Sequence, residues 1–185
     1  MKYFQQQATR IISKYFVVVL LFSVLLLGNS SCGEQGRLVN GATVPNIELE
    51  DKDGNLLSLE EIGKNKIVVI DFWASWCKPC IETHKALKEV YEEYSDLQIG
   101  NADGLVIYSV SLDDKATDWK RALEKHNIPW YNVHDPAGFK SEYVDKFQFE
   151  TIPQVYVIDE RGIIIAKNIT LKWLQYELNR RMGKV

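Results

Sequence analysis

The hydrophobic positions of the chain follow the periods of strands and helices in turn. Residues 67–73 are almost continuously apolar and β-branched, as in a parallel strand covered on both faces. Between residues 81 and 94 the apolar positions recur every three or four residues, which predicts an amphipathic helix. Residues 104–112 predict a second buried strand and residues 115–126 a further helix. Strands that alternate with helices favour an α/β fold with parallel strands.

Turn sequences and shorter patterns predict the remaining elements. The turn Asp53-Gly54-Asn55 separates two short apolar segments, and Glu160-Arg161-Gly162 separates two others. The elements predicted in this way are a hairpin within 46–59, a helical stretch over 138–147, an antiparallel hairpin within 155–167 and a closing helix over 171–182.

The N-terminal residues have the order of a secretory signal. Three basic residues precede an apolar run from Tyr15 to Leu27, and small residues follow. The run is shorter than the ~20 apolar residues that cross a membrane, so cleavage is expected. The predicted organisation is a signal peptide at 1–31, a tether at 32–43 and a folded domain at 44–185.

Cys32 follows small residues, and this arrangement is similar to the lipobox of bacterial lipoproteins, in which the cysteine is acylated. Asn29 stands where lipoproteins usually have Leu. The resemblance implies a lipid anchor at Cys32 on the periplasmic side of a bacterial membrane. The alternative is a conventional signal peptide with an incidental cysteine. In either case the chain is expected to be exported to a compartment where cysteine pairs can cycle between dithiol and disulfide.

Charge and composition exclude other classes of protein. The chain is 46% hydrophobic and 25% charged, as expected for one globular domain. Its net charge is −3, and the first 31 residues hold three of the 22 basic residues and none of the acidic ones. The remainder is therefore more acidic than the whole chain, and no binding to nucleic acid is expected.

Cys77 and Cys80 are the candidate redox centre. Two residues separate them in the chain, at a strand-to-helix junction where a disulfide can form with little backbone movement. The positive N-terminus of the helix stabilises a thiolate at Cys77, so Cys77 is the predicted attacking sulfur and Cys80 the resolving one. Pro79 fits the first helical turn and Lys78 adds a positive charge, so both are expected to tune the redox potential.

The segment from Asp71 to Cys80 is similar to the active-site segment of thioredoxins, and Thr151-Ile152-Pro153 resembles their cis-proline segment. From Val44 to Met182 the chain resembles the membrane-anchored TlpA/ResA-like reductases. This resemblance implies a thioredoxin-like fold, with a central mixed sheet flanked by helices, an N-terminal hairpin extension and an added helical segment. It also implies a monomeric thiol:disulfide oxidoreductase.

The same resemblance assigns roles to individual residues. Asp71 is the buried acid, whose charged form is disfavoured by desolvation and which accepts the proton of Cys80. Pro153 is cis and lies against the cysteine pair, which leaves the backbone of Ile152 free to pair with a substrate chain. Trp76 is expected to be partly exposed and, together with Lys78 and Pro79, to line the surface that binds the substrate.

The implied partners are disulfide-containing proteins and a membrane electron donor that reduces the pair again; no cofactor is expected. The dipeptide Lys78-Pro79 and the family likeness favour a reductant. Anchored relatives often carry Glu three residues after the second cysteine, where this chain has Thr83, and Glu82 is rotated from that position by ~100°. A function in cytochrome c maturation is therefore less well supported than the general activity.

A metal site is the alternative interpretation. Cys77, Cys80 and His84 fall on one helical face, and a copper- or zinc-binding metallochaperone would use them as ligands. A structural zinc site needs four ligands, and only His126 and His134 remain as histidine donors. His84 is more simply interpreted as a helix residue at the edge of the core.

Overall fold

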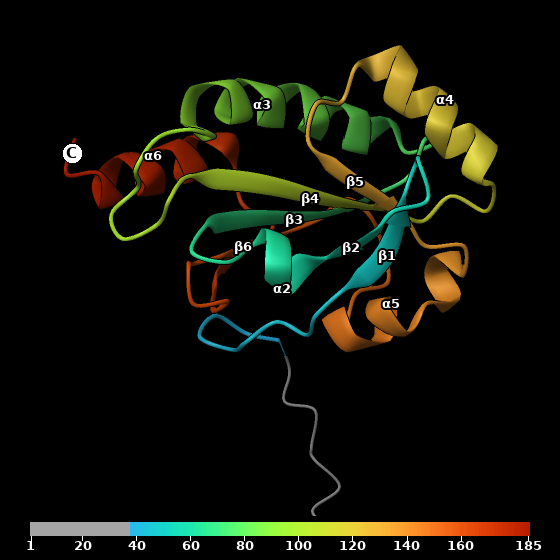
Figure 1. Cartoon of the computed structure of the whole chain (residues 1–185), viewed down its shortest axis with the longest axis horizontal. Coiled ribbons are helices and arrows are strands. Elements are labelled where there is room, and N and C mark those ends of the chain that lie inside the picture. The colour runs from blue at the N-terminus through green and yellow to red at the C-terminus, as the bar shows by residue number, and fades with distance from the viewer. Residues whose placement is uncertain (1–37) are drawn as a thin grey trace, which may run out of the picture. The chain divides into compact units, whose positions relative to one another are not determined.

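The computed structural model describes residues 38–185, which form one sheet with helices on both faces (Figure 1). The strands are β1 (Glu48–Asp51), β2 (Leu56–Ser58), β3 (Ile67–Trp73), β4 (Leu105–Ser111), β5 (Tyr131–His134), β6 (Gln154–Ile158) and β7 (Ile164–Lys167). The helices are α2 (Leu59–Ile62), α3 (Lys78–Tyr94), α4 (Ala116–His126), the 3-10 turn η1 (Gly138–Lys140), α5 (Glu142–Phe147) and α6 (Leu171–Arg181).

The sheet is mixed, with the strand order β2-β1-β5-β4-β3-β6-β7. Strands β3, β4 and β5 are parallel, whereas β6, β7, β1 and β2 each run antiparallel to their neighbour toward the centre. The hairpin of β1 and β2 extends the sheet beyond β5. The predicted α/β class, the mixed sheet and the N-terminal hairpin extension are therefore confirmed.

Three elements differ from the sequence prediction. The short helix α2 was not predicted, and it begins at Leu59, the last residue of the predicted hairpin. Strand β5 was not predicted, because its four residues carry too few apolar positions to show a period of two. The helical stretch over 138–147 is divided by Ser141, whose hydroxyl accepts the Tyr143 N–H and caps α5.

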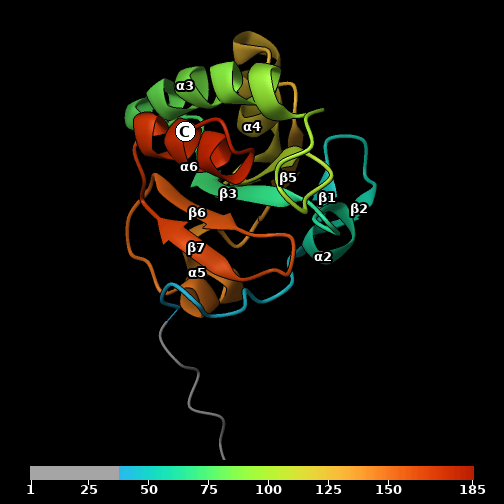
Figure 2. The same ribbon diagram turned by 90° about the vertical axis from the view of Figure 1, so that its left-hand side faces the viewer.

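The alternation of side chains along β3 separates two cores. Val68, Ile70 and Phe72 belong to the core on the α5 side of the sheet, whereas Ile67 and Val69 pack under α3 and α6. Helices α3 and α6 lie side by side over this second face (Figure 2). Because successive side chains of a strand alternate between faces, Asp71 points toward α3.

Residues 38–43 pack on the domain, although the sequence analysis assigns them to the tether. Leu38 is buried, and its carbonyl oxygen accepts a hydrogen bond from Lys167 Nζ at 2.7 Å. The Gly41 N–H donates to the carbonyl of Ile164, also at 2.7 Å. The packed part of the chain thus includes Leu38, while Cys32 and the predicted signal peptide lie outside the described residues.

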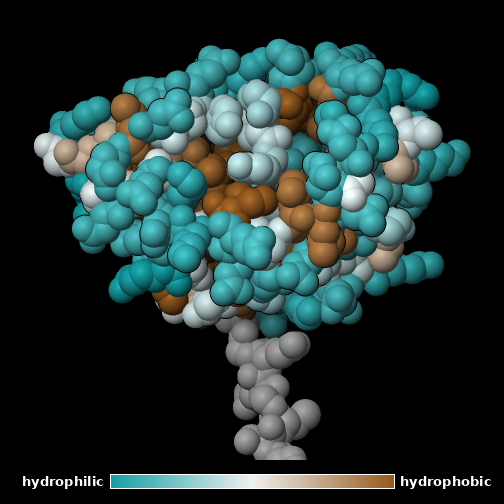
Figure 3. All heavy atoms as spheres, in the orientation of Figure 1, coloured by the Kyte–Doolittle hydropathy of each residue, from teal (hydrophilic) through white to brown (hydrophobic). Residues whose placement is uncertain are grey.

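The face drawn in Figure 3 is mostly hydrophilic, with a limited apolar area near its middle. Between residues 38 and 185, no helix combines the length and the hydrophobicity that a membrane crossing requires.

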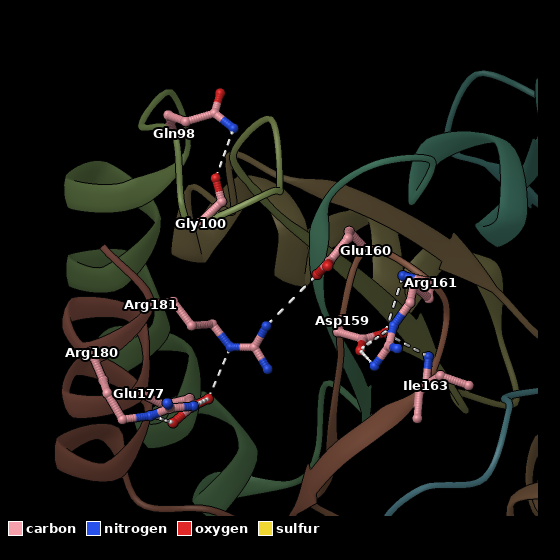
Figure 4. Close-up of polar contacts among 9 residues, drawn as sticks. All are labelled: Gln98, Gly100, Asp159, Glu160, Arg161, Ile163, Glu177, Arg180 and Arg181. Carbon is pink, nitrogen blue, oxygen red and sulfur yellow. Dashed lines mark hydrogen bonds and ion pairs between the residues drawn. The ribbon is translucent and has the colours of Figure 1, made fainter. Parts of the chain in front are cut away.

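A cluster of ion pairs ties the C-terminal helix to the turn between β6 and β7 (Figure 4). Glu177 accepts hydrogen bonds from Arg180 at 2.6 and 2.8 Å and from Arg181 Nε at 2.8 Å. Arg181 also lies 3.7 Å from the carboxylate of Glu160. The hydrogen bonds from Arg180 lower the pKa of Glu177 below its ordinary value of 4.5, although partial burial opposes this shift.

A group with a lowered pKa stabilises the fold above its unfolded pKa and loses this effect as the pH falls through the folded value. Glu177→Gln is therefore expected to cost about 1 kcal/mol of the free energy of unfolding at pH 7. The difference from wild type should shrink as the pH falls below 4.5. Urea unfolding at several pH values measures this difference in the free energy of unfolding. Glu82→Gln, in an exposed ion pair with Lys85, is the control and should change stability little.

Candidate active site

The two cysteines form a disulfide at the N-terminus of α3, with their Cα atoms 5.3 Å apart. Cys77 is the N-cap residue, and its Sγ accepts the Cys80 N–H at 3.2 Å. Pro79 lies in the first turn, where its missing N–H leaves no intrahelical hydrogen bond unmade. The sulfur of Cys77 thus occupies the position where a helix stabilises negative charge.

The two sulfurs differ in their access to solvent. Cys77 is 4% exposed, whereas Cys80 is fully enclosed. Lys78 stands between them in the chain with its side chain exposed. An incoming disulfide therefore reaches Cys77 first.

Asp71 is fully buried beneath α3, and its partner is His84. His84 Nε2 lies 2.6 Å from Asp71 Oδ2, and the same oxygen accepts a hydrogen bond from Ser109 Oγ at 3.0 Å. Trp130 Nε1 donates to Ser109 Oγ at 2.8 Å. His84 is 4% exposed and paired with the buried acid, a contact that the sequence did not predict.

The sheet register aligns three polar residues under α3 and α4. Asp71, Ser109 and Asn132 are neighbours across β3, β4 and β5, so their side chains share one face of the sheet. Asn132 Oδ1 accepts hydrogen bonds from Trp119 Nε1 at 2.8 Å and from Trp73 Nε1 at 3.3 Å. Both indoles are buried, and Asn132 Oδ1 satisfies both of their N–H groups.

The loop that leads to Cys77 is held by a carboxylate that the sequence analysis did not select. Asp113 follows β4 and is buried. It accepts hydrogen bonds from Ser75 N at 2.9 Å and Ser75 Oγ at 2.6 Å, and from Ser111 Oγ at 2.8 Å. The contact fixes the residues just before Trp76 to the end of β4.

Asp113→Ala is expected to lower the free energy of unfolding by about 2 kcal/mol, because it leaves the part-buried donors of Ser75 and the buried hydroxyl of Ser111 without this acceptor. Asp114→Ala, at the exposed neighbouring position, should stay within about 0.5 kcal/mol of wild type. Urea denaturation of both variants measures the difference. Equal losses in the two variants would contradict the assigned role of Asp113.

Apolar side chains lie beside the disulfide, at Trp76 directly before Cys77 and at Ile152. Trp76 is 60% exposed, and its ring centroid lies 6.4 Å from that of Phe139, which is 41% exposed and belongs to η1. The Ile152–Pro153 peptide bond is cis, as expected. Ile152 packs against the cluster that contains both cysteines. Phe139 is the member of this surface that the sequence did not predict, because it lies 59 positions after Cys80 in the chain.

The geometry does not support the metal interpretation. The sulfur atoms are joined to each other, and His84 Nε2 is engaged with Asp71. Within residues 38–185, no three His, Cys, Asp or Glu side chains are grouped closely enough to hold a metal ion.

The comparison with protein families decides the membership of the chain. The model of the AhpC/TSA family matches residues 40–167, which is more than half of the sequence. The chain belongs to the AhpC/TSA family. Thioredoxin-like protein YneN of Bacillus subtilis is 28% identical over 127 residues, 67% of this chain and 68% of that protein. Thiol-disulfide oxidoreductase ResA of Bacillus cereus is 24% identical over 162 residues, 81% of this chain and 87% of ResA.

Solved structures confirm the thioredoxin-like fold. The thioredoxin domain of a thiol-disulfide oxidoreductase from Bacteroides vulgatus has a TM-score of 0.68 at 28% identity, covering 77% of this chain and 99% of that domain. The C-terminal domain of a putative thiol-disulfide oxidoreductase from Bacteroides thetaiotaomicron has a TM-score of 0.72 at 24% identity, with coverage of 81% and 100%. The predicted family likeness and the enzyme class, thiol-disulfide oxidoreductase, are confirmed for this member of the AhpC/TSA family.

Proposed function

We propose that the chain reduces disulfides of protein substrates outside the cytoplasm, with Cys77 as the attacking sulfur and Cys80 as the resolving one. One observation carries the assignment: Cys77 is the more accessible sulfur and receives the Cys80 N–H at the N-terminus of α3. That environment favours a thiolate at Cys77, which is the nucleophile of disulfide exchange.

The reaction proceeds in two exchanges. The Cys77 thiolate attacks one sulfur of the substrate disulfide, forms a mixed disulfide and releases the other substrate sulfur as a thiolate. Asp71 then takes the proton of Cys80, whose thiolate attacks the Cys77 sulfur. The Cys77–Cys80 disulfide forms, and the substrate leaves with both sulfurs reduced and two electrons gained.

The exposed surface beside the disulfide serves to dock the substrate chain. The backbone of Ile152, before the cis Pro153, pairs with an extended segment of substrate, and Trp76 contacts its side chains. Lys78 and Pro79 adjust the redox potential. A membrane electron donor reduces the pair after each turnover.

A redox titration tests the direction of electron flow. The protein from Arg37 onward forms one compact unit, so it is equilibrated with dithiothreitol or glutathione buffers and followed by thiol alkylation and Trp fluorescence. A two-electron transition below about −220 mV supports a reductant. A value near −120 mV would mark an oxidant, and no reversible transition would remove the proposed function.

We also propose that the exported chain is anchored through lipid on Cys32, on the periplasmic side of the membrane. The support is the order of basic, apolar and small residues before Cys32. Intact mass of the membrane-extracted mature protein should show an acylated N-terminal Cys32. An unmodified N-terminus at another residue would rule out the anchor.

A further inference from the structure

His84 is a buried titratable residue that the two exchange steps above do not use. It stands four residues after Cys80, so the two side chains lie on adjacent turns of the same buried face of α3. Its Nε2 atom is 2.6 Å from Asp71 Oδ2, a distance that requires a proton between the two atoms. The imidazole therefore contacts the same carboxylate that takes the proton of Cys80.

The surroundings fix the orientation of this pair. The edges and faces of Trp73 and Trp130 enclose the imidazole, with ring centroids 4.6 and 5.6 Å away. Because Trp130 donates to the Ser109 oxygen, the hydroxyl hydrogen of Ser109 is directed to Asp71. Asp71 Oδ2 thus faces two groups with fixed positions, His84 Nε2 and the Ser109 hydroxyl. A proton that leaves Asp71 has the Nε2 atom of His84 as its nearest titratable acceptor within the described residues.

The second ring nitrogen of His84 has a different environment. Nδ1 is buried and has no protein partner in the described part of the chain. His84 also lines a pocket of about 260 Å³ between α3 and α4, to which Lys85, Lys88, Lys125 and His126 contribute. An unpaired buried nitrogen beside a polar pocket of this size is a position where water completes the hydrogen bonding.

The pocket shares no lining residue with the docking surface. Trp76, Phe139 and Pro153 are absent from its lining, which comes from α3, α4 and the residues up to Trp130. His84 therefore lines a pocket separate from the docking surface, and water in this pocket stays accessible while the substrate covers Cys77.

We propose that His84 carries the proton between Asp71 and the solvent of this pocket while the substrate covers Cys77. This inference deepens the proposed reductase function and rests on it. Before the transfer, one proton lies between Asp71 Oδ2 and His84 Nε2, and the ring carries its other N–H hydrogen on Nδ1. Asp71 Oδ1 then takes the Cys80 proton, the shared proton moves to Nε2, and Nδ1 releases its proton to water. Each turnover needs one such transfer, since one proton leaves Cys80 when it becomes a thiolate. The reverse transfer accompanies reduction of the Cys77–Cys80 disulfide.

The test compares single turnovers of the full chain with a disulfide-containing peptide, resolving the formation of the mixed disulfide from its resolution. In His84→Gln the amide can still donate to Asp71 but cannot relay a proton. We expect resolution to slow about 10²-fold, a typical contribution of general acid–base catalysis, while formation of the mixed disulfide keeps its rate. His126→Gln removes the other imidazole of the pocket without a contact to Asp71, and it should keep both rates.

A rescue experiment separates proton transfer from a structural role. In His84→Ala, added imidazole should restore the resolution rate in proportion to its concentration and basicity. A wild-type resolution rate in His84→Gln would overturn the inference. So would a His84→Ala variant that is folded, as thermal unfolding shows, but whose slow resolution rate is not restored by imidazole. If the wild-type chain itself forms no mixed disulfide, the proposed reductase function is wrong. That result differs from one in which the mixed disulfide forms normally and only the role of His84 is refuted.

Discussion

Cys80→Ser is expected to accumulate as a covalent mixed disulfide with substrate, joined through Cys77. The variant retains the attacking sulfur, but it lacks the thiol that would release the substrate. The adduct should appear on non-reducing gels and in intact mass spectra at one substrate per chain, and dithiothreitol should dissolve it. Turnover should fall to the uncatalysed rate.

Cys77→Ser is the matched control for the trapping experiment. It removes the more exposed sulfur and leaves the enclosed Cys80, so no adduct should form and turnover should again be lost. Trapping by Cys77→Ser instead of Cys80→Ser would reverse the assigned roles. Because serine differs from cysteine by one atom and both positions lie at the start of α3, the two variants test roles rather than folding.

Asp71→Asn is expected to slow the reduction of substrate about 10²-fold by removing the base that accepts the Cys80 proton. The loss should be greatest at low pH, where solvent bases remove this proton least readily. Asparagine keeps the size of the side chain and an oxygen for Ser109 Oγ, so the fold should persist. Single-turnover rates between pH 5 and 9 measure the effect.

The control for Asp71→Asn is another buried aspartate, far from the disulfide in the turn after β6. Asp159 is 2% exposed and accepts hydrogen bonds from Arg161 and Ile163 (Figure 4). Asp159→Asn should lower stability without changing the pH dependence of the rate. An unchanged pH–rate profile in Asp71→Asn would refute its role as the base. Combining Asp71→Asn with His84→Gln should slow resolution no further than Asp71→Asn alone, because both side chains act on one proton.

The sequence by itself determined the elements whose pattern is local. The continuous apolar run of β3 predicts a strand covered on both faces, and the helical period after Cys77 predicts α3. Two cysteines three positions apart at that junction determine the redox chemistry, because the spacing alone lets both sulfurs lie in the first helical turn. The hairpins were predictable for the same reason, since their turns stand between the strands that they join.

Tertiary structure alone decided the surroundings of the cysteine pair. His84 meets Asp71 across 13 residues of sequence, and Ser109 reaches the same carboxylate across 38. The register of β3 with β4 and β5 sets these partners, and no local period encodes a register between strands that lie far apart in the chain. Asp113 and Phe139 come to the site for a similar reason: each follows a strand or turn whose position depends on packing. The local pattern thus specifies the two sulfurs, and the packing of α3 on the sheet brings together the groups that we propose move protons to and from them.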